Sequence, residues 1–80
     1  MQHKPTGRYR VTIYSTRLGR TFTNRVEVRQ VSAPSPEAAL RTLRLSCYAI
    51  VAHGPKGERF FEVSSRCNPI ARWASVVEVA

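Results

Sequence analysis

Few residues of this chain suit catalysis or metal binding. Histidine and cysteine occur only twice each, as His3, His53, Cys47 and Cys67. They lack the short spacing of a zinc site, and no third group marks a nucleophile pair. The loop Gly54-Pro55-Lys56-Gly57 is too short to cradle a phosphate. We therefore expect no enzyme activity, no metal and no cofactor.

Long apolar runs and acidic residues are also scarce. No stretch is long enough to span a membrane. We find no secretory signal and no Cys-x-x-C pair, so we expect a reducing, cytoplasmic location away from membranes. Five acidic residues face thirteen lysines and arginines, for a formal net charge of +8. This balance favours an acidic partner, either nucleic acid or an acidic protein surface.

The length of 80 residues allows one small domain with one core. We expect this domain to cover residues 1–80 as a monomer, with residues 1–6 as a flexible arm. No internal repeat, linker or low-complexity segment divides the chain.

One long helix is predicted over residues 35–54. The start Ser35-Pro36-Glu37 combines a capping hydroxyl, a proline at the first position and a charge that suits the dipole. The pair Gly54-Pro55 is typical of a helix end. The apolar residues between them recur at helical spacing and would form one buried face: Ala39, Leu40, Leu43, Cys47, Ile50 and Val51.

A shorter helix is the alternative interpretation. In it the helix ends near Ser46, residues 48–53 form a strand, and residues 54–57 form a hairpin loop. The long helix is favoured because no turn residue separates Leu45 from Tyr48, and the Gly-Pro stop comes later.

Four strands are predicted around this helix. Residues 8–14 and 21–31 alternate apolar and polar side chains and are joined by a turn at Gly19. Residues 59–64 and 72–79 form the second pair. The fold class is therefore α+β, a single antiparallel sheet with one helix on one face in the order β-β-α-β-β. The expected core combines the helix face with Tyr9, Val11, Ile13, Phe22, Val26, Val28, Phe61, Val63, Trp73 and Val77.

The uncovered sheet face is the first candidate site. Arginines interleaved with aromatic rings can neutralise phosphates and stack on bases, although Glu27 and Glu62 fall on the same predicted face. A solvated, charged sheet face is the structural alternative. The candidate partner-binding residues, including the tip of the first hairpin, are Arg8, Arg10, Tyr14, Arg17, Arg20, Arg25, Arg29, Phe60 and Arg72.

The outward face of the helix is the second candidate. Arg41, Arg44, Leu45 and Tyr48 would combine exposed apolar groups with arginine, as protein–protein contacts do. Isolated exposed apolar residues are also normal on a protein surface.

The order of elements supports a family resemblance. A hairpin, the Ser-Pro-Glu-Ala-Ala-Leu helix start, the aromatic strand Arg59-Phe60-Phe61-Glu62-Val63 and a last strand with Trp73 together resemble small phage-encoded type I anti-CRISPR proteins. The resemblance implies an inhibitor that docks on a Cas subunit of a surveillance complex and obstructs target DNA. The positive charge excludes an acidic DNA mimic. It leaves a basic inhibitor as the first hypothesis and a direct, weakly specific nucleic-acid-binding protein as the second.

The sheet-face hypothesis predicts the effect of two charge reversals. Arg25→Glu or Arg29→Glu should weaken binding of the partner while leaving the fold intact, which titration and circular dichroism would measure. If neither variant changes binding, the outward helix face becomes the better candidate.

Overall fold

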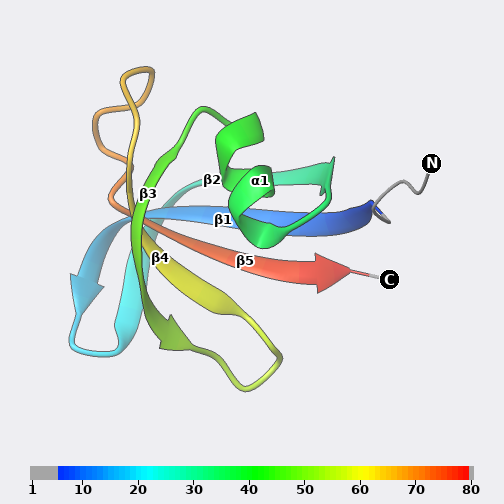
Figure 1. The fold of residues 1–80 in the computed structure, drawn as a ribbon. Coiled ribbons are helices and arrows are strands. Elements are labelled where there is room, and N and C mark those ends of the chain that lie inside the picture. The colour runs from blue at the N-terminus through cyan, green and yellow to red at the C-terminus, as the bar shows by residue number, and fades with distance from the viewer. Residues whose placement is uncertain (1–5, 80) are drawn as a thin grey trace.

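The computed structural model describes residues 6–79 as one five-stranded antiparallel sheet with a single helix. The elements are β1 (Gly7–Leu18), β2 (Thr21–Ala33), α1 (Pro36–Thr42), β3 (Ser46–His53), β4 (Arg59–Ser64) and β5 (Trp73–Val79). The strand order is β2-β1-β5-β4-β3, and α1 covers one face of the sheet (Figure 1). The predicted fold class, a single antiparallel sheet with one helix on one face, is confirmed, but the order is β-β-α-β-β-β, with one strand more than predicted. The predicted arm lies outside the described residues except for Thr6.

The helix begins as the sequence predicts. Ser35 is the N-cap, and its Oγ accepts a hydrogen bond from the backbone N–H of Ala38 at 3.1 Å. Pro36 occupies the first helical position, where a missing N–H costs nothing. The predicted start of the helix is therefore confirmed.

The predicted length of the helix is wrong, because α1 ends at Thr42. The N–H of Leu45 bonds to the carbonyl of Leu40 at 3.0 Å, and the N–H of Arg44 bonds to that of Arg41 at 2.9 Å. This pair of bonds is a Schellman ending. Arg44 adopts the left-handed conformation with φ 60°, a position that glycine usually fills. Leu40 and Leu45 are both buried, so the ending is stabilised by an apolar contact with the core.

The shorter-helix alternative is therefore the correct one. Residues 46–53 form the edge strand β3, and residues 54–58 connect it to β4. Gly57 has φ 83° in this connection, and the Gly54 N–H bonds to the Glu58 carbonyl at 2.8 Å. Cys47 and Ile50, which we predicted to be buried on the helix, are exposed on β3.

The core lies between α1 and the sheet. Its buried apolar residues are Tyr9, Val11, Ile13, Ala33, Ala39, Leu40, Leu45, Phe61, Val63, Ala71, Ala74 and Val76. The alternating residues predicted from β1 and β4 are confirmed. On β5, however, the buried positions are Ala74 and Val76, so Trp73 and Val77 alternate onto the opposite face. We call this face, which α1 leaves uncovered, the open face.

A bulge changes which residues of β2 share a face. Ile13 pairs with Glu27, whereas Tyr14 pairs with Arg25, so Val26 is the extra residue. Arg29 pairs with Val11 on the helix side, and Val28 pairs with Thr12 on the open face. Val28 is 43 % exposed, which contradicts its prediction as a core residue. The predicted grouping of Arg25 with Glu27 and Arg29 is also wrong, because the bulge separates them.

The Schellman ending predicts that Arg44→Gly stabilises the protein. The left-handed conformation costs a non-glycine residue on the order of 1 kcal/mol, and glycine avoids this cost. Glycine also gives the unfolded chain more conformational entropy, which offsets part of the gain. We expect a net gain of about 0.5 kcal/mol in the free energy of unfolding in urea. The control Arg41→Gly makes the same chemical change inside the helix and should cost about 1 kcal/mol. Equal effects of the two variants would contradict this account.

Candidate functional site

Four aromatic side chains form a second cluster on the open face. Phe22 of β2 stacks on Phe60 of β4 with ring centroids 4.3 Å apart and an interplanar angle of 8°. The ring of Trp73 meets that of Phe22 edge-on, with centroids 5.9 Å apart, and the ring centroid of Tyr14 lies 6.0 Å from that of Phe22. All four residues are partly exposed. The cluster therefore offers apolar surface to solvent instead of completing the core.

The end of the first hairpin bends to make this cluster. Asn24 lies between the bulge at Val26 and the tip of the hairpin, and it has φ 58°. Its side-chain amide donates a hydrogen bond to Thr16 Oγ1 at 2.7 Å. Bulges increase the local twist of a strand pair. The tip of the β1–β2 hairpin consequently turns toward β3 and β4 (Figure 1), and Phe22 reaches Phe60 across two intervening strands.

Arg17 is fixed against the aromatic cluster. Its guanidinium carbon lies 5.3 Å from the ring centroid of Phe22 and 5.2 Å from that of Trp73, within the range of cation–π attraction. Its Nε donates to the carbonyl of Gly19 at 2.7 Å. These contacts hold a positive charge at the surface in a defined place.

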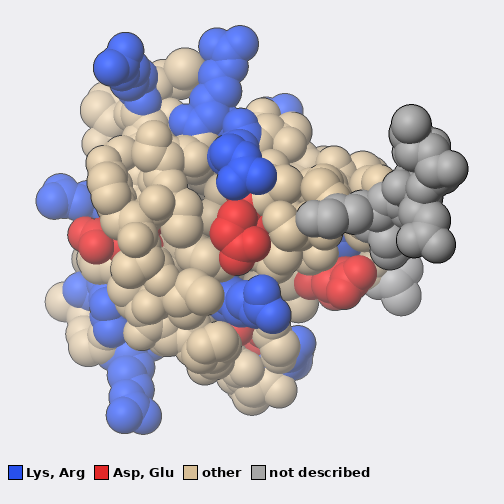
Figure 2. Space-filling model, viewed as in Figure 1, with Lys and Arg blue, Asp and Glu red and all other residues tan. Residues whose placement is uncertain are grey.

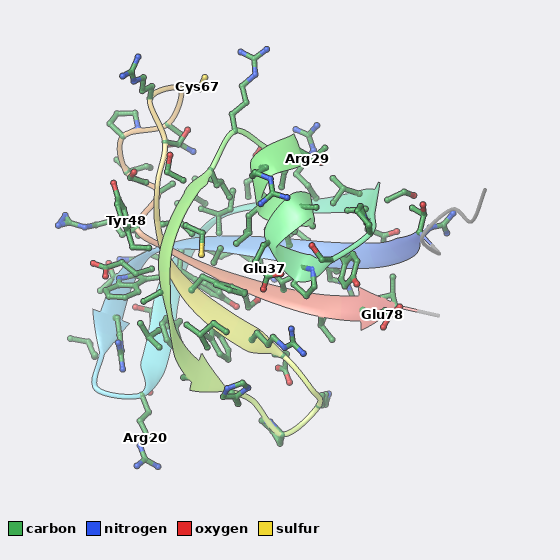
Figure 3. All side chains as sticks on the ribbon, in the orientation of Figure 1. Arg20, Arg29, Glu37, Tyr48, Cys67 and Glu78 are labelled. Atoms are coloured by element: carbon green, nitrogen blue, oxygen red, sulfur yellow. The ribbon has the colours of Figure 1, made fainter. Side chains whose placement is uncertain are left out.

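A cleft of about 450 Å³ opens between the tips of the two hairpins. Arg17 and Arg20 lie on the β1–β2 side, and Ala52 and His53 on the β3 side, with the stacked rings between them. Arg20 is exposed, and its side chain extends from the tip of the first hairpin into solvent (Figure 3). We call this feature the hairpin cleft.

One acidic side chain also lines the hairpin cleft, but it is already engaged. Glu58 Oε1 accepts a hydrogen bond from the backbone N–H of Lys56 at 2.8 Å. A Cβ built on Gly54 would lie 2.7 Å from that same oxygen, so the absence of a side chain at residue 54 lets the carboxylate fold back onto the loop. The bond to Lys56 holds the carboxylate within its own hairpin.

Further arginines lie along the open face from the cluster. Arg25 pairs with Tyr14. Arg8 and Arg10 alternate with the buried Tyr9 and Val11 and are exposed. The open face also carries Glu62, which pairs with Trp73. The result is a mainly basic strip along β1 that ends at the aromatic cluster.

The structure brings only part of the predicted site together. Arg8, Arg10, Tyr14, Arg25 and Phe60 lie on the open face, and Arg17 and Arg20 lie at its end. Arg29 is on the other side of the sheet, and Figure 3 shows it close to α1, far from Arg20. It lies 3.5 Å from Glu27 in an exposed ion pair. Arg72 is exposed just before β5.

The second candidate patch does not form as predicted. Leu45 is only 3 % exposed, because it is part of the helix ending. Tyr48 is exposed on β3, where its hydroxyl hydrogen-bonds with Ser64 Oγ at 2.8 Å. Arg41 and Arg44 are exposed. On the face seen in Figure 2, basic side chains lie at the edges and near the centre, with glutamates between some of them, so they do not make a continuous basic track there.

Sequence reasoning missed two residues of the aromatic cluster, Phe22 and Trp73. The sequence pattern predicts both for the core because each is the first apolar residue of its predicted strand. For Trp73 a signal was present: Ala74 and Val76 give β5 an equally regular alternation in the opposite phase. For Phe22 the signal was hidden, because the left-handed conformation of Asn24, with φ 58°, interrupts the alternation of β2 between Arg25 and the tip.

Residues 6–79 contain neither a cluster of potential metal ligands nor a helix that could span a membrane. No group of three or more histidine, cysteine or acidic side chains could hold a metal ion within this range. The same residues contain no helix long and apolar enough to cross a membrane. His3, one of the four histidine and cysteine residues of the sequence, lies outside the described residues.

Cys47 is exposed as a residue, but its thiol is partly shielded at the boundary between β3 and α1. Partial burial raises the pKa of the Cys47 thiol, and the negative charge of Glu37 raises this pKa further. Both effects disfavour the thiolate. The Cys47 thiol is therefore less nucleophilic at neutral pH than an ordinary exposed thiol.

This environment predicts slow alkylation of Cys47. In a Cys67→Ser background, folded protein should react with iodoacetamide more slowly than urea-unfolded protein at pH 8, because fewer thiols are ionised when the pKa is raised. The difference should shrink as the pH rises through the folded pKa. Glu37→Gln should speed the reaction, whereas Glu78→Gln, at the far end of the sheet (Figure 3), should not. Equal rates in the two variants would contradict the role of Glu37.

Comparisons of this chain with protein-family models, with curated proteins and with solved structures gave no match.

Proposed function

We propose that this protein is a non-enzymatic binding module that holds nucleic acid on its open face. The observation that supports this most directly is the position of Arg17. Its guanidinium lies over Phe22 and Trp73, so a fixed positive charge stands beside partly exposed rings. Sites that bind nucleic acid combine positive charges, which neutralise phosphates, with aromatic rings, which stack on bases.

The arginines of β1 extend this site. Arg8 and Arg10 are two residues apart on the same face, about 7 Å along the strand, and Arg25 pairs with Tyr14 at the edge of the cluster. With Arg17 and Arg20 they could neutralise about four phosphates. The net charge of +8 adds a general attraction for polyanions.

Inhibition of a CRISPR-Cas complex stays a prediction from the resemblance. A basic inhibitor could use the same open face in two ways, either by holding target DNA out of place or by docking on an acidic surface of a Cas subunit. Direct binding of nucleic acid by the pure protein supports the first way. Absence of such binding at physiological salt leaves the acidic protein surface as the partner.

The first test is the salt dependence of binding. Fluorescence anisotropy of labelled single-stranded DNA and RNA should show affinity falling about 50-fold between 50 and 200 mM NaCl, since about four phosphate contacts give a slope near −2.8 for single strands. A flat salt response, or no binding at 50 mM, would contradict the proposal.

A matched pair on β2 tests which face is used. Arg25→Glu and Arg29→Glu make the same charge change, but Arg25 is on the open face and Arg29 is on the helix side. We expect Arg25→Glu to weaken binding about tenfold and to lower the slope of log affinity against log salt by the amount that about one phosphate contact contributes. Arg29→Glu should change binding much less. Equal losses would show that only net charge matters.

A further inference from the structure

The stacked pair leaves one aromatic ring available at the cleft. Phe22 is contacted by Phe60, Tyr14, Trp73 and Arg17. Among the described residues, Phe60 has an aromatic contact with Phe22 alone, and no cation lies over its ring. The Phe60 side chain is partly exposed. Tyr14 meets the same two conditions, but it does not line the hairpin cleft, whereas Phe60 does. The stacking surface available in the cleft is therefore on Phe60.

The neighbour of Phe60 on β3 is small. Ala52 is the residue paired with Phe60 across the β3–β4 ladder, so both side chains lie on the same face of the sheet. A methyl group covers little of an adjacent ring. Ala52 and Phe60 both line the hairpin cleft, and the space beside the ring is part of this cleft.

The size and charge of the cleft restrict what it can hold. A volume of about 450 Å³ falls within the lower range of small-ligand sites. Arg17 and Arg20 favour an anionic group at one side, while the Glu58 carboxylate is bonded to the Lys56 amide. The matching ligand is a flat aromatic ring that carries a phosphate.

We infer that the hairpin cleft takes one unpaired nucleotide, whose base stacks on Phe60 and whose phosphate lies near Arg17 and Arg20. This inference rests on the proposed function and makes it more specific. A base inside a duplex is paired and stacked on its neighbours, so it cannot enter the cleft without leaving the helix. The protein should therefore prefer single-stranded to double-stranded nucleic acid.

The test fills the cleft without changing charge. Ala52→Leu places a larger side chain beside Phe60, and Ala49→Leu makes the same change at an exposed position of β3 that does not line the cleft. Anisotropy with labelled dT12 and with a 12-base-pair duplex should show about a tenfold loss for dT12 in Ala52→Leu, the scale of one stacked base. Duplex binding should be unchanged in this variant, and Ala49→Leu should bind both probes like the parent protein.

A second variant and a small probe cover a failure of Ala52→Leu to fold. Phe60→Leu keeps an apolar side chain but removes the ring, and it should lose the preference for dT12. Adenosine monophosphate should change the fluorescence of Trp73, the single tryptophan, and should compete with dT12 at high concentration. Binding of both probes with equal affinity, unchanged in both variants, would overturn the cleft assignment and leave the proposed function standing. Binding of neither probe would overturn both.

Discussion

The stacked contact between Phe22 and Phe60 determines the shape of the open face. β2 and β4 are separated in the sheet by β1 and β5, so their side chains can meet only if the sheet curves across those two strands. The bulge at Val26 and the left-handed Asn24 provide that curvature. Stacking of this kind is worth about 0.5–1.5 kcal/mol beyond the area that it buries. At the centre of the curved face, Thr12 and Ser75 are 9 % and 7 % exposed, although no helix covers them.

The sheet is thus covered differently on its two sides. On one side, α1 and Leu45 close a conventional core over Val11 and Phe61. A helix of seven residues is too short to be stable alone, so it depends on the buried contacts of Leu40 and on its two caps. On the other side, the sheet covers itself with the bent hairpin. This second solution leaves rings and arginine side chains partly exposed, which a fully packed layer would not do.

The sequence predicted the parts of this fold that depend on regular patterns. Alternation located β1, β4 and most of β2, and the Ser-Pro-Glu start located the first turn of α1. It failed where a single backbone conformation decides the outcome. Arg44 ends the helix in a conformation that its side chain does not favour, and only the burial of Leu45 makes this ending worthwhile. Without that tertiary contact, residues 35–53 keep a helical period, and the shorter alternative could be stated but not selected.

The sequence predicted the types of residue in the candidate site better than it predicted which individual residues belong to it. Arginines and aromatic residues on the uncovered face were expected, and Tyr14, Arg25 and Phe60 do lie there. The bulge at Val26 could not be read from local preferences, because neither glycine nor proline marks it. That one inserted residue places Arg29 on the helix side, and the left-handed conformation of Asn24 then interrupts the alternation between Arg25 and Phe22, so that Phe22 leaves the predicted core. A phase error in one strand therefore altered half of the assignments on β2.

The two edges of the sheet are both protected against pairing with a strand of another molecule. An exposed edge can pair with a strand of another molecule unless it is protected. β2 is protected by Arg25, Glu27 and Arg29 and by its bulge. β3 has no charged residue between Ser46 and His53, but its ladder with β4 shifts register after Cys47 and again after Ile50. Two shifts within one short strand prevent a regular set of hydrogen bonds to an added strand. With both edges interrupted, the binding that we propose uses a face of the sheet instead of an edge, so it requires no change in strand pairing.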